Sequence, residues 1–364
     1  MKSELTDQEK KELQYIDKFN ATTGKQGWHV KDKLFKEQNI AGIELINSSL
    51  DNVDLQSVKG QESTVNNSKL YQVRFLSGDY SRSRFNNVEF SECEFDGASF
   101  KDAQFVNSTF KSCRADRVKM ENVVFDSCVF EDFSDKNGIY TGAQFLKARV
   151  SKPNWHNSSF YRARFEESEF VGGIIEMSIF GNASIADLKL TDMAVNSCSF
   201  SESKIEGLVF DGCRSKGITF GKTEITNLTF AGCDGLDGLN LMNSSCRRLS
   251  IEKCKGVSEP KFYLSEISEW SIKESHLSYL YCVESRFLSS GLISNCSIAG
   301  ANFSKARMEH VTVENSLFAD YLVLSGGTFQ NLVLKDVSYD KKVEIDDQGV
   351  TYIDSDRFPS RQTK

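Results

Sequence analysis

A phenylalanine recurs at every fifth residue from Phe85 to Phe110, at positions 85, 90, 95, 100, 105 and 110. This period constrains the fold more than any other feature of the chain. An α-helix repeats its faces every 3.6 residues and a flat strand every two, so neither keeps a five-residue repeat on one face. The sequence therefore predicts a backbone that turns regularly between short extended segments.

The five-residue period runs without interruption from Ile40 to Phe230 and covers 39 positions, which we call centres. Only Gly60, Asp135 and Ser215 among these centres are not apolar. Because 39% of the residues are hydrophobic, chance would make only about 15 of these centres apolar. The pattern therefore predicts one continuous core along most of the chain.

Small residues dominate the position two before each centre, for example Cys93 before Phe95 and Ala98 before Phe100. Residues two apart on an extended backbone share a face, so we expect both positions to point inward. Most of the ten cysteines occupy this small position, and no CxxC pair is present. We interpret them as reduced core residues. The expected aromatic core includes Phe85, Phe90, Phe95, Phe100, Phe105, Phe110, Phe125 and Phe165.

The spacing in Ala98-Ser99-Phe100, Ala103-Gln104-Phe105, Ala143-Gln144-Phe145 and Ala301-Asn302-Phe303 resembles the pentapeptide-repeat family. The resemblance covers roughly residues 40 to 340. It implies an all-β fold, a right-handed quadrilateral β-helix with one repeat per side and four repeats per coil. The weakest centres support this period, because Ala115 and Asp135, like Ser215 and Gly235, lie twenty residues apart.

We expect three regions in the chain. In residues 1–34, a capping box at Thr6 and Glu9 precedes apolar residues at helical spacing, which predicts a helical cap over 7–19. Residues 35–340 form the β-helix. In residues 341–364, an alternating segment around positions 347–349 predicts a hairpin cap followed by a basic tail. We expect caps because a β-helix otherwise ends in unpaired strands.

Two departures from the repeat are predicted to protrude and to bind a partner. The segment 131–141 places Asp135 at a centre, where an unpaired buried carboxylate is costly, and contains the turn signal Asn137-Gly138. After Phe230 the period slips by single inserted residues, which corners or bulges would absorb, and 233–260 is the most irregular part. The candidate binding residues are Asp132, Asp135, Lys136, Asn137, Asp234, Asp237, Lys253 and Lys255.

The sequence contains no recognisable catalytic machinery. Its four histidines have no metal-ligand spacing, and no nucleophile, phosphate-loop or dinucleotide motif is present. We expect no enzyme activity, metal or cofactor. The first twenty residues are too polar for a signal peptide, and no apolar run approaches the roughly 18 residues of a membrane span. We therefore expect a bacterial cytoplasmic protein, or one delivered to another cell by a signal-less secretion route.

Two functions remain open. The first is a non-catalytic scaffold or bacterial effector that binds a protein partner. The second is a DNA mimic that binds and protects DNA gyrase or topoisomerase IV, because the repeats are similar in style to the quinolone-resistance members of the family. The net charge is −7 with both signs interleaved, far below the duplex density of about one charge per 1.7 Å. This disfavours direct nucleic-acid binding and favours the scaffold, whereas a continuous acidic stripe would favour the mimic.

Overall fold

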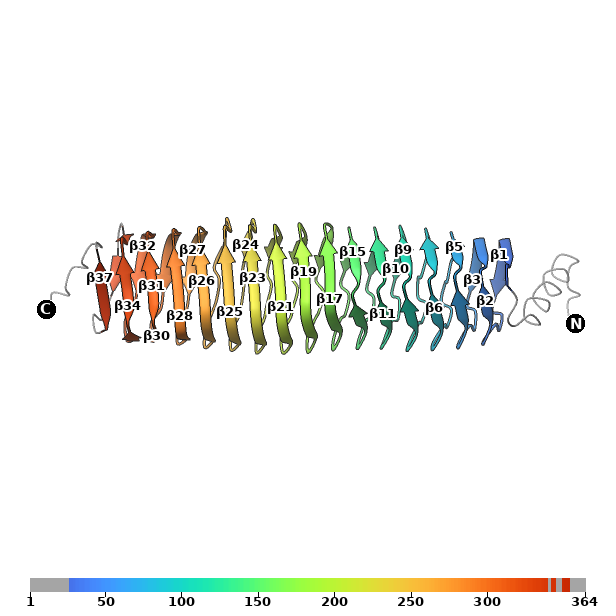
Figure 1. Cartoon of the computed structure of the whole chain (residues 1–364), viewed down its shortest axis with the longest axis horizontal. Helices are drawn as coiled ribbons and strands as arrows, with labels where there is room; N and C mark the ends of the chain where they lie inside the picture. Colours follow the sequence, from blue (N-terminus) through green and yellow to red (C-terminus); the bar gives the residue numbers. More distant parts are fainter. Residues whose placement is uncertain (1–25, 340–341, 345–348, 354–364) are drawn as a thin grey trace, which may run out of the picture. The chain divides into compact units, whose positions relative to one another are not determined.

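The computed structural model describes residues 26–339, 342–344 and 349–353. The helix predicted over 7–19 lies outside these residues. All regular elements in the described ranges are β-strands, and within each of two compact units, residues 1–144 and 145–364, the strands stack as successive parallel coils (Figure 1).

The strands of the first unit are mostly three residues long, and two of them, β1 and β3, continue around a corner. They are β1 (His29–Lys36), β2 (Glu44–Ile46), β3 (Ser49–Gln56), β4 (Thr64–Asn66), β5 (Lys69–Tyr71), β6 (Arg84–Asn86), β7 (Glu89–Ser91), β8 (Gln104–Val106), β9 (Thr109–Lys111), β10 (Arg114–Asp116), β11 (Val124–Asp126), β12 (Val129–Glu131) and β13 (Ser134–Lys136).

The second unit contains more strands that run through a corner, and its first strand begins at the last residue of the first unit. The strands are β14 (Gln144–Leu146), β15 (Arg149–Ser151), β16 (Asn154–His156), β17 (Arg164–Val171), β18 (Ile174–Glu176), β19 (Ser184–Thr191), β20 (Ala194–Asn196), β21 (Lys204–Asp211), β22 (Arg214–Lys216), β23 (Glu224–Ala231), β24 (Leu236–Asp237), β25 (Ser245–Glu252), β26 (Glu266–Lys273), β27 (His276–Tyr281), β28 (Arg286–Ser294), β29 (Ser297–Asn302), β30 (Arg307–Glu309), β31 (Val311–Glu314), β32 (Leu317–Val323), β33 (Thr328–Gln330), β34 (Leu332–Lys335), β35 (Ser338–Tyr339), β36 (Lys342–Glu344) and β37 (Val350–Ile353).

Each coil of the first unit takes twenty residues. Strands β4, β6, β8 and β11 pair in parallel so that Val65, Phe85, Phe105 and Phe125 stand in one column. Because centres recur every five residues, one coil holds four of them, one on each side. The predicted β-helix with four repeats per coil is therefore confirmed.

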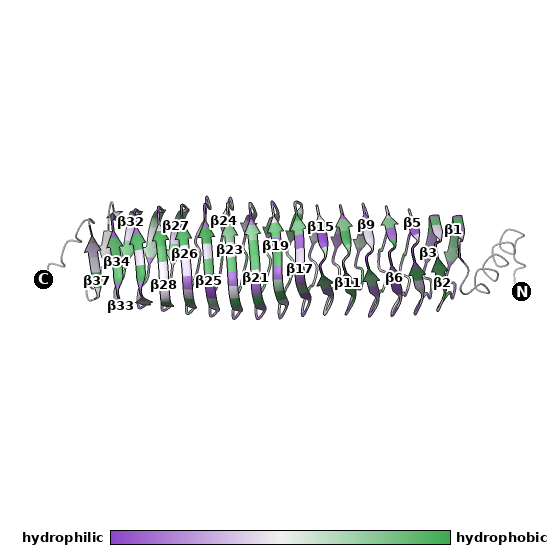
Figure 2. Cartoon of the chain, in the orientation of Figure 1, coloured by the Kyte–Doolittle hydropathy of each residue, from purple (hydrophilic) through white to green (hydrophobic). Residues whose placement is uncertain are grey.

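The centres form a dry interior of stacked side chains. The eight phenylalanines expected in the core are all at most 2% exposed. The rings of Phe85 and Phe105 lie 4.7 Å apart at an interplanar angle of 7°, and those of Phe90 and Phe110 lie 4.8 Å apart at 3°. In the second unit Phe165 stacks on Phe145 at 5.0 Å. These distances suit offset stacking, and Figure 2 shows the apolar residues alternating with polar ones along the strands.

The corners depend on one backbone conformation. The residue two after a centre has a positive φ, for example +48° at Asn67, +54° at Asn87 and +49° at Asn107. Left-handed backbone is least costly for glycine, asparagine and aspartate, and these residues are frequent at this position. The repeated left-handed residue turns the chain between its short strands.

The centre Gly60 is explained by its neighbour one coil later. A Cβ atom at Gly60 would lie 2.7 Å from Cδ1 of Tyr80, and Tyr80 is buried. The tyrosine ring therefore fills the space that the missing side chain leaves.

The prediction that 131–141 protrudes or opens to solvent is wrong. Asp135 lies in β13, pairs in register with Ala115 of β10 and is 1% exposed. Burial and the carboxylate of Asp135, which also accepts its hydrogen bond, raise the pKa of Tyr140 well above its ordinary value. A Cβ atom at Gly138 would lie 2.2 Å from Oδ2 of Asp135. The carboxylate is thus accommodated inside the coil by a tyrosine and a glycine.

The prediction that 233–260 protrudes is also wrong. Strand β25 pairs in register with β23, and an isolated bridge joins Asp234 to Lys255. The register changes from twenty to twenty-one residues at Gly235, because Ser215 pairs with Leu236. A second glycine, Gly256, lies directly beside Gly235 in the next coil. Because both extra residues are left-handed glycines, the insertion adds length to a corner and not a loop.

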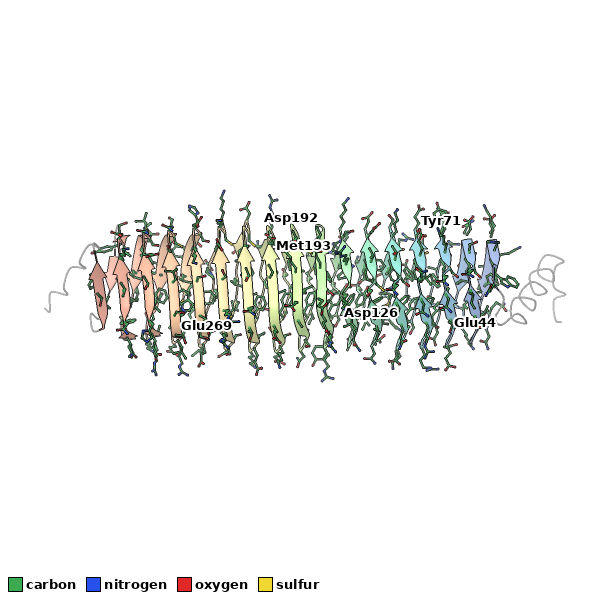
Figure 3. All side chains as sticks on the ribbon, in the orientation of Figure 1. Glu44, Tyr71, Asp126, Asp192, Met193 and Glu269 are labelled. Atoms are coloured by element: carbon green, nitrogen blue, oxygen red, sulfur yellow. The ribbon has the colours of Figure 1, made fainter. Side chains whose placement is uncertain are left out.

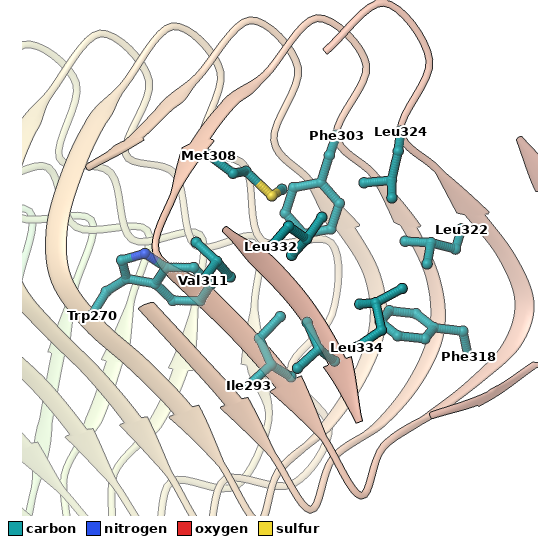
Figure 4. Close-up of a pocket in the computed structure, with 11 residues that line it drawn as sticks. Trp270, Ile293, Phe303, Met308, Val311, Phe318, Leu322, Leu324, Leu332 and Leu334 are labelled. Atoms are coloured by element: carbon teal, nitrogen blue, oxygen red, sulfur yellow. The ribbon is translucent and has the colours of Figure 1, made fainter. Parts of the chain in front are cut away.

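Later insertions are absorbed as bulges, as the sequence predicted. The register shifts between Ser268 and Trp270 where β26 meets β28, and between Ile298 and Gly300 where β29 meets β32. The interior there contains a cavity of about 20 Å³ with a purely apolar lining that includes Trp270, Phe303 and Leu334 (Figure 4). An apolar cavity of this size stays dry, so the bulges leave the core continuous.

The ends of the β-helix also differ from the prediction. The first coil begins before residue 35, since β1 pairs with β3 and Gln26 bridges Ile46. The C-terminal hairpin is wrong, because β36 lies parallel to β32 and β37 lies parallel to β34, in different sheets. An alternation of apolar and polar residues fits both a hairpin and a further coil. Here each of the two strands pairs with a strand of the preceding coil and so extends the β-helix.

The inward and outward assignment can be tested by two substitutions on one strand. Phe105→Ala should reduce the free energy of unfolding by about 3 to 5 kcal/mol, because it leaves a cavity inside a stacked column. Gln104→Ala, at an exposed neighbour, should change it by less than about 0.5 kcal/mol. Chemical denaturation of both variants gives the two values, and equal costs would contradict the assignment.

Candidate interaction surfaces

The outward positions of the first unit carry charges that alternate between coils. Lys69 pairs with Glu89 at 3.3 Å, Arg114 with Glu94 at 2.9 Å, and each partner lies twenty residues away. Exposed pairs of this kind add little stability, but they neutralise one another. Side chains project outward from the strands in both units, Tyr71 and Glu269 among them (Figure 3). The ion pairs therefore break up the surface into small patches of both signs.

A polar groove of about 420 Å³ runs along one corner of the first unit. It is lined by Asn67, Asn87 and Asn107, which stand one above the other, together with the Lys69–Glu89 pair. The amide of Asn87 donates a hydrogen bond to that of Asn67 at 2.9 Å. Side chains that already bond to one another leave the groove with little unused polarity for a ligand.

Four half-buried tyrosines gather on the second unit, and we call Tyr263, Tyr279, Tyr281 and Tyr321 the tyrosine cluster. The rings of Tyr279 and Tyr321 stack 5.9 Å apart at 15°, and those of Tyr263 and Tyr281 lie 6.2 Å apart at 27°. Tyr279 and Tyr281 connect the two pairs at 6.5 Å. The cluster therefore offers a continuous aromatic surface with hydroxyl groups.

The cluster depends on a glycine and on an inserted residue. Tyr279 is in register with Gly300, and Gly300 is in register with Tyr321 after the bulge in β29 and β32. A Cβ atom at Gly300 would lie 2.6 Å from the ring of Tyr321. The ring of Tyr321 therefore lies across Gly300 and reaches Tyr279, two coils away along the stack.

The phenol of Tyr321 has a raised pKa. Burial, followed by a hydrogen bond with Tyr281, raises the pKa of Tyr321 to about 12. A phenol whose pKa is higher in the folded protein than in the unfolded chain stabilises the fold below about pH 10. That contribution is lost as the pH rises towards 12.

This late titration gives a direct test of the cluster. In an ultraviolet titration of phenolate absorbance, Tyr321→Phe should remove the step near pH 12, and Tyr281→Phe should move it towards the ordinary value of about 10. Burial is the larger cause, so Tyr281→Phe should shift the step only in part. A step that persists unchanged in Tyr321→Phe would contradict the assignment.

An apolar ridge crosses one coil of the second unit, formed by Val171, Ile174, Met177 and Ile179. Their side chains are between 38% and 52% exposed, although each occupies an outward position that is polar in most repeats. Ile179 and the ring of Tyr161 flank Gly181. Scattered exposed hydrophobic residues are ordinary, but four of them within residues 171–179 make this stretch a candidate interaction site.

A model of the pentapeptide-repeat family, with eight copies of the repeat, matches residues 81–111. The structure shows the same parallel coils in both units, with a register of twenty residues that lengthens to twenty-one where residues are inserted. The chain is a pentapeptide-repeat protein. A comparison of its sequence with curated proteins finds no match.

Solved structures similar to this pentapeptide-repeat protein include two others of the family. HetL, involved in heterocyst differentiation regulation in the cyanobacterium Nostoc, is 11% identical over 63% of this chain and 92% of its own, with a TM-score of 0.30. QnrB1, a plasmid-mediated fluoroquinolone resistance protein, is 13% identical over 51% and 93%, with a TM-score of 0.22. PfbA, a surface adhesin of Streptococcus pneumoniae, is 10% identical over 93% and 87%, with a TM-score of 0.26. Because these TM-scores are low, the assignment to the family is based on the repeats and not on the similarity to these structures.

The candidate binding residues of the first unit lie on one regular side of the pentapeptide-repeat coil. Asp132 and Lys136 are exposed, whereas Asn137 is half-buried and donates a hydrogen bond to Asp116 at 3.1 Å. Asp135 is buried, so it cannot contact a partner. The segment therefore offers two exposed charges and no built pocket.

The candidates of the second unit lie close to the two inserted glycines, Gly235 and Gly256. Asp234 and Lys255 are exposed and joined by an isolated bridge between neighbouring coils, and Asp237 is half-buried in β24. Lys253 occupies a left-handed corner and lies 3.8 Å from the carboxylate of Glu252. These residues provide outward charges whose role in binding stays a prediction.

Sequence reasoning missed both the tyrosine cluster and the apolar ridge. The repeat pattern contained a signal for the apolar ridge. Ile174 and Met177 stand one before and two after the centre Ile175, where the repeat elsewhere prefers polar residues. For the tyrosine cluster the linear pattern held no such signal, because only the strand register shows that an inserted residue after Phe318 turns Tyr321 outward.

Chemistry at the described residues is limited. No group of three His, Cys, Asp or Glu side chains within these ranges could hold a metal ion. Burial raises the pKa of the Cys128, Cys198 and Cys246 thiols to about 12, so they stay protonated and unreactive at neutral pH. Among the residues that the structure describes, no helix has the length and hydropathy required to span a membrane.

Proposed function

We propose that this protein is a non-catalytic scaffold that binds a protein partner through the tyrosine cluster. The cluster is the observation that carries the proposal. Tyrosine provides a large contact area with few rotatable bonds and a polar tip, and it is enriched in interface hot spots. Four such rings across neighbouring coils, half-exposed and held by stacking, provide a preorganised surface that loses little entropy on binding.

The regular coils support the same proposal. Their outward charges are paired between coils, so they offer a partner few unique features. A partner that recognises this protein specifically must use the departures from the repeat. Tyr321 joins the tyrosine cluster because Gly300 and an inserted residue break the period, so the cluster includes one of those departures.

The alternative function is protection of DNA gyrase or topoisomerase IV by mimicry of DNA. A mimic requires a continuous acidic face, because duplex DNA carries about one negative charge per 1.7 Å. The outward residues that stack on successive coils of this protein instead alternate in charge, as in the Lys31–Asp51 and Lys69–Glu89 pairs. Charge distribution thus favours the scaffold.

As a bacterial effector, the protein would meet its partner in another cell, and culture fractionation would show whether it leaves the producing cell.

The scaffold function can be tested by affinity capture with a matched pair of variants. The variant Tyr279→Ser/Tyr281→Ser removes the centre of the cluster, and Tyr71→Ser removes an exposed tyrosine of the first unit. We expect the same proteins to be captured by the wild type and by Tyr71→Ser, and their recovery to fall at least about tenfold with the double variant. Quantitative mass spectrometry of the captured proteins gives the ratio.

A gyrase supercoiling assay with a fluoroquinolone separates the two functions. The scaffold predicts no protection by any of the three proteins. Protection that is equal in the wild type and the double variant, and that disappears at high salt, would favour the mimic, because screening weakens attraction between exposed charges. Capture that is unchanged in the double variant would reject the tyrosine cluster as the binding surface.

A further inference from the structure

One side of the second unit carries a column of outward residues with a regular order of charges. Strands β16, β18, β20, β22 and β24 pair in register and place His156, Glu176, Asn196, Lys216 and Asp237 one above the other. The column therefore has a base, an acid, a neutral amide, a base and an acid. If a second copy of the column is rotated by 180° about Asn196, each base of one copy faces an acid of the other.

The positions beside this column are also complementary under the same rotation. Ile174 and Met177 of the apolar ridge lie one coil before Asn196, and Arg214 and Gly217 occupy the equivalent positions one coil after it. The coil between them presents Ala194 and other small residues. The ridge would thus meet an arginine stem and a glycine, where there is room for a large apolar side chain.

We propose that two copies of this protein pair through this side, face to face and antiparallel, about a two-fold axis that runs along β20. Glu176 of each copy meets Lys216 of the other, and His156 meets Asp237. Met177 lies over Gly217, and the two Asn196 amides face each other on the axis. Such a contact is isologous, since the same residues of both copies contribute to it.

The bases and acids in one copy are already neighbours along this column. His156 lies 3.1 Å from Glu176, and Lys216 is in register with Asp237. Bringing the copies together would place each acid between two bases, and each base between two acids. Of the chain's exposed large hydrophobic residues within the described ranges, Ile174 and Met177 are the two on this side, with 39% and 52% of their surfaces exposed.

The size of the face sets the strength of the dimer. Five strands at about 4.8 Å spacing give a contact of roughly 20 Å along the stack. One side of the coil over that length has an area well below the roughly 800 Å² per partner of a standard stable interface. We therefore expect a concentration-dependent dimer with a Kd on the order of 100 µM.

Sedimentation velocity of the full chain over a concentration series tests the proposal. Glu176→Lys and Lys216→Glu should each weaken dimerisation at least about tenfold, because like charges then meet across the axis. The double variant Glu176→Lys/Lys216→Glu should restore dimerisation to within about threefold of the wild type, because the opposite charges meet again. Met177→Asp should abolish it.

A second exchanged pair serves as the control. Glu266 and Arg286 form an exposed ion pair at 3.0 Å on another side of the same unit, and Glu266→Lys with Arg286→Glu should leave dimerisation unchanged. A wild type that stays monomeric at millimolar concentration would overturn the proposal. So would a dimer that tolerates Glu176→Lys, or an exchanged double variant that is no more dimeric than its single variants.

Discussion

Parallel backbone hydrogen bonding at a spacing of twenty residues is the constraint on which the rest of the structure depends. It places identical positions of successive coils one above the other, so that Phe85 stacks on Phe105 and Lys69 pairs with Glu89. Four left-handed corners in each coil are required to keep that register. The core, the ion pairs and the outward positions of the regular coils follow from this single repeat.

The proposed binding surface then depends on where the repeat fails without breaking the stack. Single inserted residues at Gly235 and in β28 and β32 change the register while the core stays closed. They cost little because glycines and bulges take up the extra length. The last of them brings the ring of Tyr321 onto Gly300 and so adds Tyr321 to the tyrosine cluster. The apolar ridge is a different departure, made by residue type alone.

The sequence predicted the coil, its period and its core, because a five-residue pattern over 39 centres leaves few alternatives. It did not predict that Asp135 would be buried inside the coil. Gly138 and Tyr140 lie beside its carboxylate, and the sequence alone does not show that these two residues are next to it. It mistook two parallel strands at the C-terminal end for a hairpin, because alternation does not specify direction. The tyrosine cluster required the register across two coils, which a linear pattern does not contain.

The central claim is the twenty-residue register, and spin-label broadening in electron paramagnetic resonance measures it directly. Labels at Lys69 and Glu89, twenty residues apart, lie on adjacent strands of one side. Labels at Lys69 and Lys59, only ten residues apart, lie on different sides of the coil. The account predicts strong dipolar broadening for the first pair and much weaker broadening for the second. Stronger broadening for the pair that is closer in sequence would contradict it.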